Sequence, residues 1–147
     1  MDSDNKGNWV DFMKMVEQIM TEKYGVTVMD HIQNPRNLKM IKDANGYASN
    51  TGQCGDTIEI WLRIKDYIIE EIAFKSNGCE ITRATASMAT ELVKGKNLAD
   101  ALKITPVQLI DALGGLPEDH IHCAYLAMRA IHEAINNYQK NNQNVAG

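Results

Sequence analysis

Several features that identify broad protein classes are missing from this 147-residue sequence. Its apolar runs fall far short of the ~20 residues needed to span a bilayer. The segment Met1 to Gly7 is polar and has no apolar core of a secretory signal peptide. Lysine and arginine total 15 against 19 acidic residues, a net charge of −4, so a broad basic surface for nucleic acid is not expected. We therefore expect a cytoplasmic protein that binds neither membranes nor nucleic acids.

Cysteine is scarce, and the cysteines are not spaced as in common metal-binding or disulfide frameworks. Three cysteines are an odd number, which argues against a disulfide framework in a reducing compartment. The sequence has no Cys-x-x-Cys pair, no glycine-rich phosphate loop after a strand, and no zinc-deaminase signature. A chain of this size still hides roughly 68% of its unfolded surface on folding, so one ordinary core is sufficient.

Hydrophobic periodicity predicts an α+β fold, with helices packed on a small antiparallel sheet of about three strands. Alternating residues predict a hairpin of strands 57–64 and 68–75, with Ile68, Ile72 and Phe74 facing inward, and a weaker strand over 47–51. Thr105 to Gln108 reads as a helix capping box. Helical spacing predicts helices within 8–33 (the second ending at Asn34-Pro35) and over about 81–93, 97–102, 106–113 and 123–140.

Three segments are expected: an N-terminal helical extension (1–23), a folded domain (24–140) and a flexible tail (141–147). The extension carries apolar residues at spacings of three and four. We interpret this face as docked on the core, and a partner or homodimer surface is the alternative. The residues concerned are Trp9, Phe12, Met13, Val16, Ile19 and Met20.

The cysteines all fall at predicted ends of elements rather than inside apolar stripes. Cys54 lies in a glycine-rich loop that enters a strand, while Cys79 and Cys123 open helices. A helix N-terminus carries partial positive charge, which favours the thiolate that binds soft metals. Buried packing is the ordinary role of a lone cysteine, but three junction thiols favour a shared site that only folding assembles.

Two further side chains stand beside these thiols. Asp56 follows Cys54 by two residues, so both face one side if the segment is extended, and His122 precedes Cys123. Each has an ordinary alternative, a turn or cap for Asp56 and a cap or surface position for His122. A Cys123 nucleophile with His122 as base is less favoured, because no third orienting group is evident. Thiolates with one hard donor suit a site that releases its metal.

With these residues collected, the sequence resembles the IscU/NifU-N family of iron–sulfur cluster assembly scaffolds from about Tyr24 to Tyr138. The motifs stand in the family's order and are specific. They are Asp30-His31, Asn34-Pro35-Arg36-Asn37, Cys54-Gly55-Asp56, Phe74-Lys75-Ser76-Asn77-Gly78-Cys79, Thr90-Glu91-Leu92-Val93-Lys94-Gly95-Lys96, His122-Cys123, Leu126-Ala127 and Ala130-Ile131.

The resemblance implies a carrier rather than an enzyme. In this family the three cysteines hold a transient [2Fe–2S] cluster, with Asp56 or His122 near the fourth position. Iron is the metal, and zinc can occupy the same site. A cysteine desulfurase supplies persulfide sulfur, with Cys123 as main acceptor, and apo-proteins receive the cluster. Asp56 keeps the cluster labile, and Tyr24 corresponds to a residue linked to dimer contacts.

The chain departs from the family at Leu116-Pro117-Glu118-Asp119-His120, where the bacterial and mitochondrial branch has Leu-Pro-Pro-Val-Lys. Because this acidic segment reverses the charge pattern, docking of a DnaK-type chaperone is doubtful, and His120 becomes a further candidate ligand. The alternative function is a zinc-dependent sulfur acceptor of the SufU type. The absence of that branch's long insertion between Cys79 and Cys123 disfavours it. A regulatory metal-binding module is a third interpretation.

Overall fold

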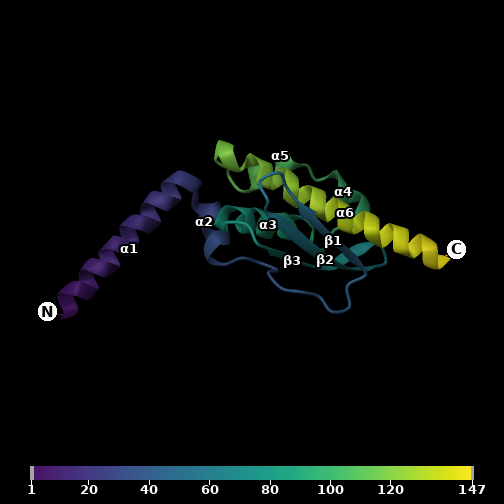
Figure 1. The fold of residues 1–147 in the computed structure, drawn as a ribbon, viewed down its shortest axis with the longest axis horizontal. Helices are drawn as coiled ribbons and strands as arrows, with labels where there is room; N and C mark the ends of the chain where they lie inside the picture. Colours follow the sequence, from purple (N-terminus) through teal and green to yellow (C-terminus); the bar gives the residue numbers. More distant parts are fainter. Residues whose placement is uncertain (1, 147) are drawn as a thin grey trace.

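Three antiparallel strands form the sheet that sequence alternation predicts. They are β1 (Gly46–Thr51), β2 (Thr57–Lys65) and β3 (Ile68–Ser76), in the order β1-β2-β3. The computed structural model describes residues 2–146, and side chains from residue 8 to residue 142. Figure 1 shows the sheet with helices packed along it, as an α+β fold requires.

The helices follow the predicted order, with some changes of boundary. They are α1 (Asp2–Tyr24), α2 (Val26–Gln33), α3 (Glu80–Val93), α4 (Leu98–Lys103), α5 (Pro106–Ala112), a 3-10 turn η1 (Glu118–His120) and α6 (Ile121–Ala146). The capping box at Thr105 and Gln108 is present. Helix α6 continues to Ala146, beyond the predicted helix end near residue 140; the flexibility expected from residue 141 stays a prediction. No helix in the described part of the chain is both long and apolar enough to cross a membrane.

The core lies between one face of the sheet and the two long helices α3 and α6. In β2 the inward residues alternate as predicted, with Ile58, Ile60 and Leu62 fully buried. The prediction for Ile68 was wrong: it is 36% exposed, while Ile69 is fully buried. An irregularity in the β2–β3 register between Arg63 and Ile64 causes this shift, because a bulge changes which residues face inward.

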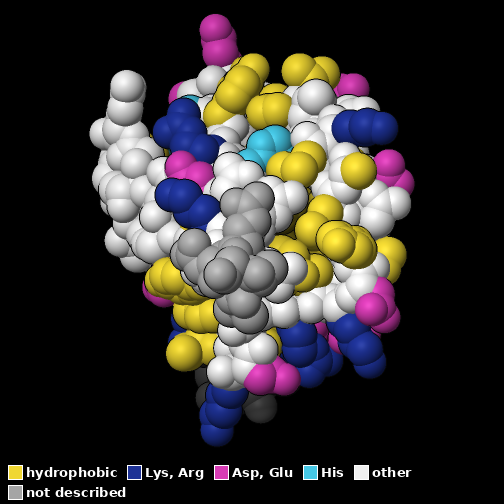
Figure 2. All heavy atoms as spheres, turned by 90° about the vertical axis from the view of Figure 1, so that its right-hand side faces the viewer, with side chains coloured by type: hydrophobic (Ala, Val, Ile, Leu, Met, Phe, Trp, Pro, Cys, Tyr) yellow, Lys and Arg dark blue, Asp and Glu magenta, His cyan; other side chains and the backbone are white. Residues whose placement is uncertain are grey.

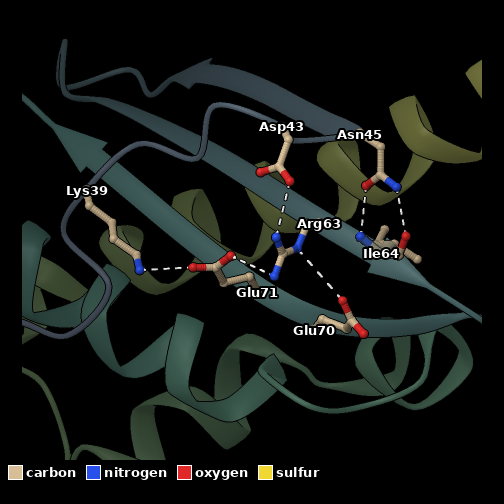
Figure 3. A network of polar contacts seen from close by, with 7 residues as sticks. All are labelled: Lys39, Asp43, Asn45, Arg63, Ile64, Glu70 and Glu71. Carbon is tan, nitrogen blue, oxygen red and sulfur yellow. Dashed lines mark hydrogen bonds and ion pairs between the residues drawn. The ribbon is translucent and has the colours of Figure 1, made fainter.

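The outer face of the sheet is polar and is held by ion pairs. Arg63 on β2 contacts Asp43, Glu70 and Glu71, and Lys39 contacts Glu71 on its other side (Figure 3). These groups are partly exposed, so each pair contributes little, of order 0–1 kcal/mol. Seen from the C-terminal end, charges of both signs are interspersed with apolar side chains rather than gathered into one basic patch (Figure 2).

Helix α1 does not pack on the core, so the predicted docked position was wrong. It projects away from the sheet and helices (Figure 1) and packs chiefly against α2. Trp9 is 64% exposed and Ile19 is 56% exposed. The apolar face therefore lines an open groove of about 500 Å³ shared with Met29 and Ile32 of α2. The alternative, a partner or homodimer surface, stays a prediction.

A hydrogen-bond network fixes the segment between α2 and β1 to the second half of α3. The buried Ser87 hydroxyl accepts the Arg36 backbone N–H at 2.8 Å and lies 2.7 Å from Nδ1 of His31. The Asn37 amide donates to Thr90 at 3.0 Å and to Glu91 at 2.9 Å. Asn37 holds a left-handed backbone, with φ of 63°, and its carbonyl accepts from Phe74 of β3. This network holds α3 in a fixed place against the sheet.

Candidate functional site

The candidate site lies at the N-terminal end of α3, where segments from three parts of the chain meet. Cys79 is the N-cap residue of α3. Asp56 stands at the end of the loop between β1 and β2, and Cys123 is in the first turn of α6. All three cysteines are free thiols. The fold therefore brings Asp56, Cys79 and Cys123 to one place, although they are far apart in sequence.

One hydroxyl connects these groups. Oγ1 of Thr82 donates a hydrogen bond to Oδ2 of Asp56 at 2.9 Å. The same oxygen lies 3.3 Å from Sγ of Cys123 and 3.6 Å from Sγ of Cys79. Thr82 is fully buried; its contact with Cys123 is shielded from water, whereas those with Asp56 and Cys79 are partly buried. The candidate ligands thus surround a single buried oxygen atom.

Gly78 permits this close arrangement because it has no side chain. A Cβ there would lie 2.7 Å from Cγ2 of Thr82 and 2.9 Å from Oδ2 of Asp56. Both distances are too short for carbon, so a larger residue would push Thr82 and Asp56 aside. The glycine before Cys79 therefore has a steric role in bringing the carboxylate to α3.

Cys123 is more enclosed than its predicted position implied. Its side chain is only 1% exposed, whereas Cys54 and Cys79 are exposed. Burial raises the pKa of the Cys123 thiol, and the nearby negative charges of Cys79, Asp56 and Cys54 add to this, while the Thr82 hydrogen bond opposes it. Desolvation disfavours the charged form, so at Cys123 it opposes the effect of the helix start, which we expected to favour a thiolate.

Cys54 lies on the other side of the site. It lines an open hollow of about 690 Å³ together with His122, Tyr125, Leu126 and Arg129. The loop is folded rather than extended: the Gly55 N–H donates to the Gly52 carbonyl at 3.0 Å, and Gly55 has φ of 90°. Cys54 therefore lines the hollow, while Oδ2 of Asp56 contacts Thr82, and the extended segment on which the predicted common direction depended is not present.

The histidines border the site from the start of α6. Nε2 of His122 lies 3.7 Å from Sγ of Cys123. The His120 and His122 rings are stacked with centroids 6.5 Å apart, and Nε2 of His120 lies 3.8 Å from a carboxylate oxygen of Asp119. His122 is thus close enough to Cys123 to join the same set of metal ligands. The His120 ring stacks on His122, and no hydrogen bond joins it to Cys123 among the described residues.

The chemistry of these donors fits a soft or borderline metal, since thiolates with one carboxylate or imidazole suit iron and zinc. As placed, no three histidine, cysteine or acidic side chains within the described part of the chain are grouped closely enough to hold an ion. The site is therefore open, and Asp56 and the three cysteines would have to move closer together to hold an ion. Metal binding would then be coupled to local ordering.

Sequence reasoning missed Thr82. A threonine inside an apolar helical stripe resembles an ordinary helix residue, and no motif marks it. The one available signal was spacing: Thr82 follows Cys79 by three residues, which places both on one side of a helix. The hollow residues Tyr125 and Arg129 were also missed, because residues on the exposed side of an amphipathic helix carry no such signal.

Comparison with known proteins shows the family of the chain. Residues 23–145 match the sequence profile of the NifU-like N terminal domain. A protein of Archaeoglobus fulgidus named iron-sulfur cluster assembly scaffold protein IscU 1 is 46% identical over 120 residues, covering 81% of this chain and 78% of its own. One of Aquifex aeolicus, named iron-sulfur cluster assembly scaffold protein IscU, is 38% identical over 122 residues, with the same coverage of 81% and 78%.

A solved structure confirms the fold. The N-terminal part of a NifU-like protein of Brucella abortus superposes with a TM-score of 0.66 at 16% identity, covering 82% of this chain and 97% of that one. The helix α1 lies almost wholly before the matched region, which begins at residue 23. From Lys23 onward, the chain belongs to the NifU-like N-terminal domain family, the family of the IscU scaffold proteins.

Proposed function

We propose that this protein is a scaffold on which a [2Fe–2S] cluster is assembled and from which it is passed to apo-proteins. The observation that carries the proposal is the meeting of Asp56, Cys79 and Cys123 around Thr82, with Cys54 exposed beside them. Iron–sulfur clusters are held by cysteine thiolates. The proposal is further supported by membership of a family whose relatives carry the scaffold name.

The cluster is cargo, so the site must both bind and release it. Three thiolates would hold the iron, and Asp56 or His122 would supply the fourth donor. A carboxylate is a hard ligand and binds a soft centre less firmly than a thiolate. The exposed Cys54 would close the site from the loop side, and its opening would release the cluster.

Sulfur would arrive as a persulfide carried by a cysteine desulfurase. In the transfer, the Cys123 thiolate attacks the outer sulfur of the donor's persulfide, a new S–S bond forms at Cys123, and the donor cysteine leaves as a thiolate. Conversion of that sulfur to sulfide needs electrons from a separate reductant. Since Cys123 is 1% exposed, acceptance there requires the start of α6 to separate from Thr82.

Anaerobic reconstitution with iron, cysteine, a cysteine desulfurase and a thiol reductant, which supplies the electrons, tests the proposal. We expect a red-brown protein with [2Fe–2S] absorption that converts an apo-ferredoxin to its holo form. A Cys79→Ser variant is the matched control and should remain colourless. A wild-type protein that takes up only zinc, stays colourless and still accepts sulfur would instead support the SufU-type alternative.

The carboxylate has its own test. Asp56→Ala should slow transfer of the cluster to the apo-ferredoxin, because the labile ligand is removed and a firmer one can replace it. His122→Ala serves as the comparison for the other candidate donor. An unchanged transfer rate in Asp56→Ala, with slowed transfer in His122→Ala, would reassign the fourth position to the histidine.

A further inference from the structure

Among the residues whose side chains the structure describes, Thr82 is the one that contacts Asp56, Cys79 and Cys123 together, although a hydroxyl is a poor ligand for soft metals. We infer that Thr82 is a positioning residue, whose single hydroxyl holds the Asp56 carboxylate and the Cys123 sulfur in place before a metal ion or cluster arrives. The inference rests on the proposed function, because it treats Asp56 and Cys123 as ligands.

The hydrogen count of the hydroxyl supports this role. A threonine hydroxyl has one proton and two acceptor positions. Its proton is directed to Oδ2 of Asp56 at 2.9 Å. The acceptor side is therefore left for the thiols, and the Cys123 sulfur lies 3.3 Å away. One oxygen atom can thus bond the carboxylate and a thiol at the same time.

The contacts leave Asp56 able to bind a metal. Only Oδ2 is engaged by Thr82, and among the described residues no side-chain hydrogen bond reaches its other carboxylate oxygen. A carboxylate fixed through one oxygen presents the second in a defined direction. Residues that orient a ligand in this way act from behind it, and losing one typically weakens metal affinity 10–100-fold.

Burial and sterics make the arrangement specific to this position. Thr82 is shielded from water, since its exposed fraction is 0%. Gly78 allows Thr82 and Asp56 to approach, because a Cβ at that residue would lie 2.7–2.9 Å from their atoms. The hydroxyl also joins segments from the loop, α3 and α6, which are otherwise separate parts of the chain.

Two substitutions separate the hydroxyl from the rest of the side chain. Thr82→Val keeps the shape and removes the hydroxyl, whereas Thr82→Ser keeps the hydroxyl and removes a methyl group. We would titrate each apo-protein with Co²⁺ anaerobically and follow thiolate-to-cobalt absorption. Thr82→Val should bind Co²⁺ about tenfold more weakly than wild type, with a changed ligand-field spectrum. Thr82→Ser should restore both affinity and spectrum.

A second test asks whether the effect of Thr82→Val on Co²⁺ binding depends on the Asp56 carboxylate. A merely structural role of Thr82 would give the same effect with and without Asp56. In an Asp56→Ala background, adding Thr82→Val should weaken Co²⁺ binding by a smaller factor than it does in the wild-type background. Circular dichroism at each step shows whether the variants are folded. If Thr82→Val does not fold, Gly78→Ala provides a second route, because it displaces Thr82 from Asp56 while keeping the hydroxyl, and it should also weaken binding.

Three results would overturn the inference. Co²⁺ affinity of Thr82→Val within twofold of wild type would show that the hydroxyl positions nothing. Equal weakening in Thr82→Ser and Thr82→Val would show that retaining the hydroxyl does not preserve binding, and would assign the effect to side-chain packing at this position. Failure of the wild-type protein to bind Co²⁺ through its thiols would overturn the proposed function, and this inference with it; the first two results leave the proposed function intact.

Discussion

Both ends of helix α3 carry hydroxyl side chains, but the two ends differ in how strongly these side chains are hydrogen-bonded to other segments. Around Ser87 and Thr90, hydrogen bonds of 2.7–3.0 Å join α3 to His31 and Asn37. Around Thr82, one bond reaches Asp56 at 2.9 Å, and the other contacts are longer approaches to sulfur at 3.3 and 3.6 Å. The far end is tied to α2 and the following segment by several short hydrogen bonds, whereas the near end leaves sulfur and carboxylate groups available to a metal.

This difference separates structure from function along one helix. The far end fixes α3 on the sheet and needs no ligand. The near end holds two sulfurs and a carboxylate close together, beside an exposed third sulfur. A rigid helix that is anchored at one end and open at the other can present ligands without collapsing when they are released.

The largest effect on stability is expected at the anchored end. Asn37→Ala removes two side-chain hydrogen bonds and places alanine at φ of 63°. We expect a loss of about 2–3 kcal/mol in the free energy of unfolding, measured by urea denaturation. Asn37→Gly, which tolerates this backbone, should lose less. Equal stability of the wild type and both variants would show that the Asn37 hydrogen bonds do not anchor α3.

The next effect concerns the reactivity of the thiols at the open end. Cys54 and Cys79 are exposed and Cys123 is buried with a raised pKa. In the apo-protein, iodoacetamide should modify Cys123 at least ~10-fold more slowly than the other two. Mass spectrometry of peptides over time gives the three rates. A Cys123 that reacts as fast as Cys54 would mean that the start of α6 is open in solution.

A smaller effect is expected from pH at the anchored end. Burial, followed by the Arg36 charge, lowers the pKa of His31 below its usual 6.5. The unfolded chain therefore takes up a proton at a higher pH than the folded one, and stability should decline as pH falls through about 6.5. Urea midpoints between pH 7.5 and 5.5 measure this. His31→Gln should show a weaker decline, and identical pH profiles would exclude His31 as the cause.

The smallest effect is expected from removing α1, which belongs to neither end. Because α1 packs chiefly against α2, deletion of residues 1–22 should change the stability of the remaining domain by less than about 1 kcal/mol. Thermal unfolding tests this, and light scattering before and after deletion tests the homodimer prediction. A large loss of stability would mean that the extension braces the fold.

Local patterns predicted the frame of the molecule well. Alternation in β2 identified its buried face, and Thr105 with Gln108 identified a helix start, because both signals depend on neighbours in sequence. The position of Ile68 was wrong because a bulge shifts the register without marking the sequence. The docked position of α1 was wrong because an amphipathic pattern shows that a face is apolar and does not show what covers it.

The sequence pointed to candidate residues for the site, but it did not predict how they are arranged. The junction positions of the cysteines pointed to a shared site, and the spacing of family motifs pointed to the same residues. Burial of Cys123 and the central place of Thr82 could not be predicted, because both result from packing of α3 against α6 and the loop. Their detection needs the distances between segments that are far apart in sequence.

The most direct measurement of the central claim is X-ray absorption at the zinc edge of protein loaded with one equivalent of zinc. If the three cysteines meet at a single site, the spectrum should show three sulfurs at about 2.3 Å and one oxygen or nitrogen near 2.0 Å. Cys54→Ser should reduce the sulfur number to two. A wild-type spectrum with fewer than three sulfur ligands would contradict the account.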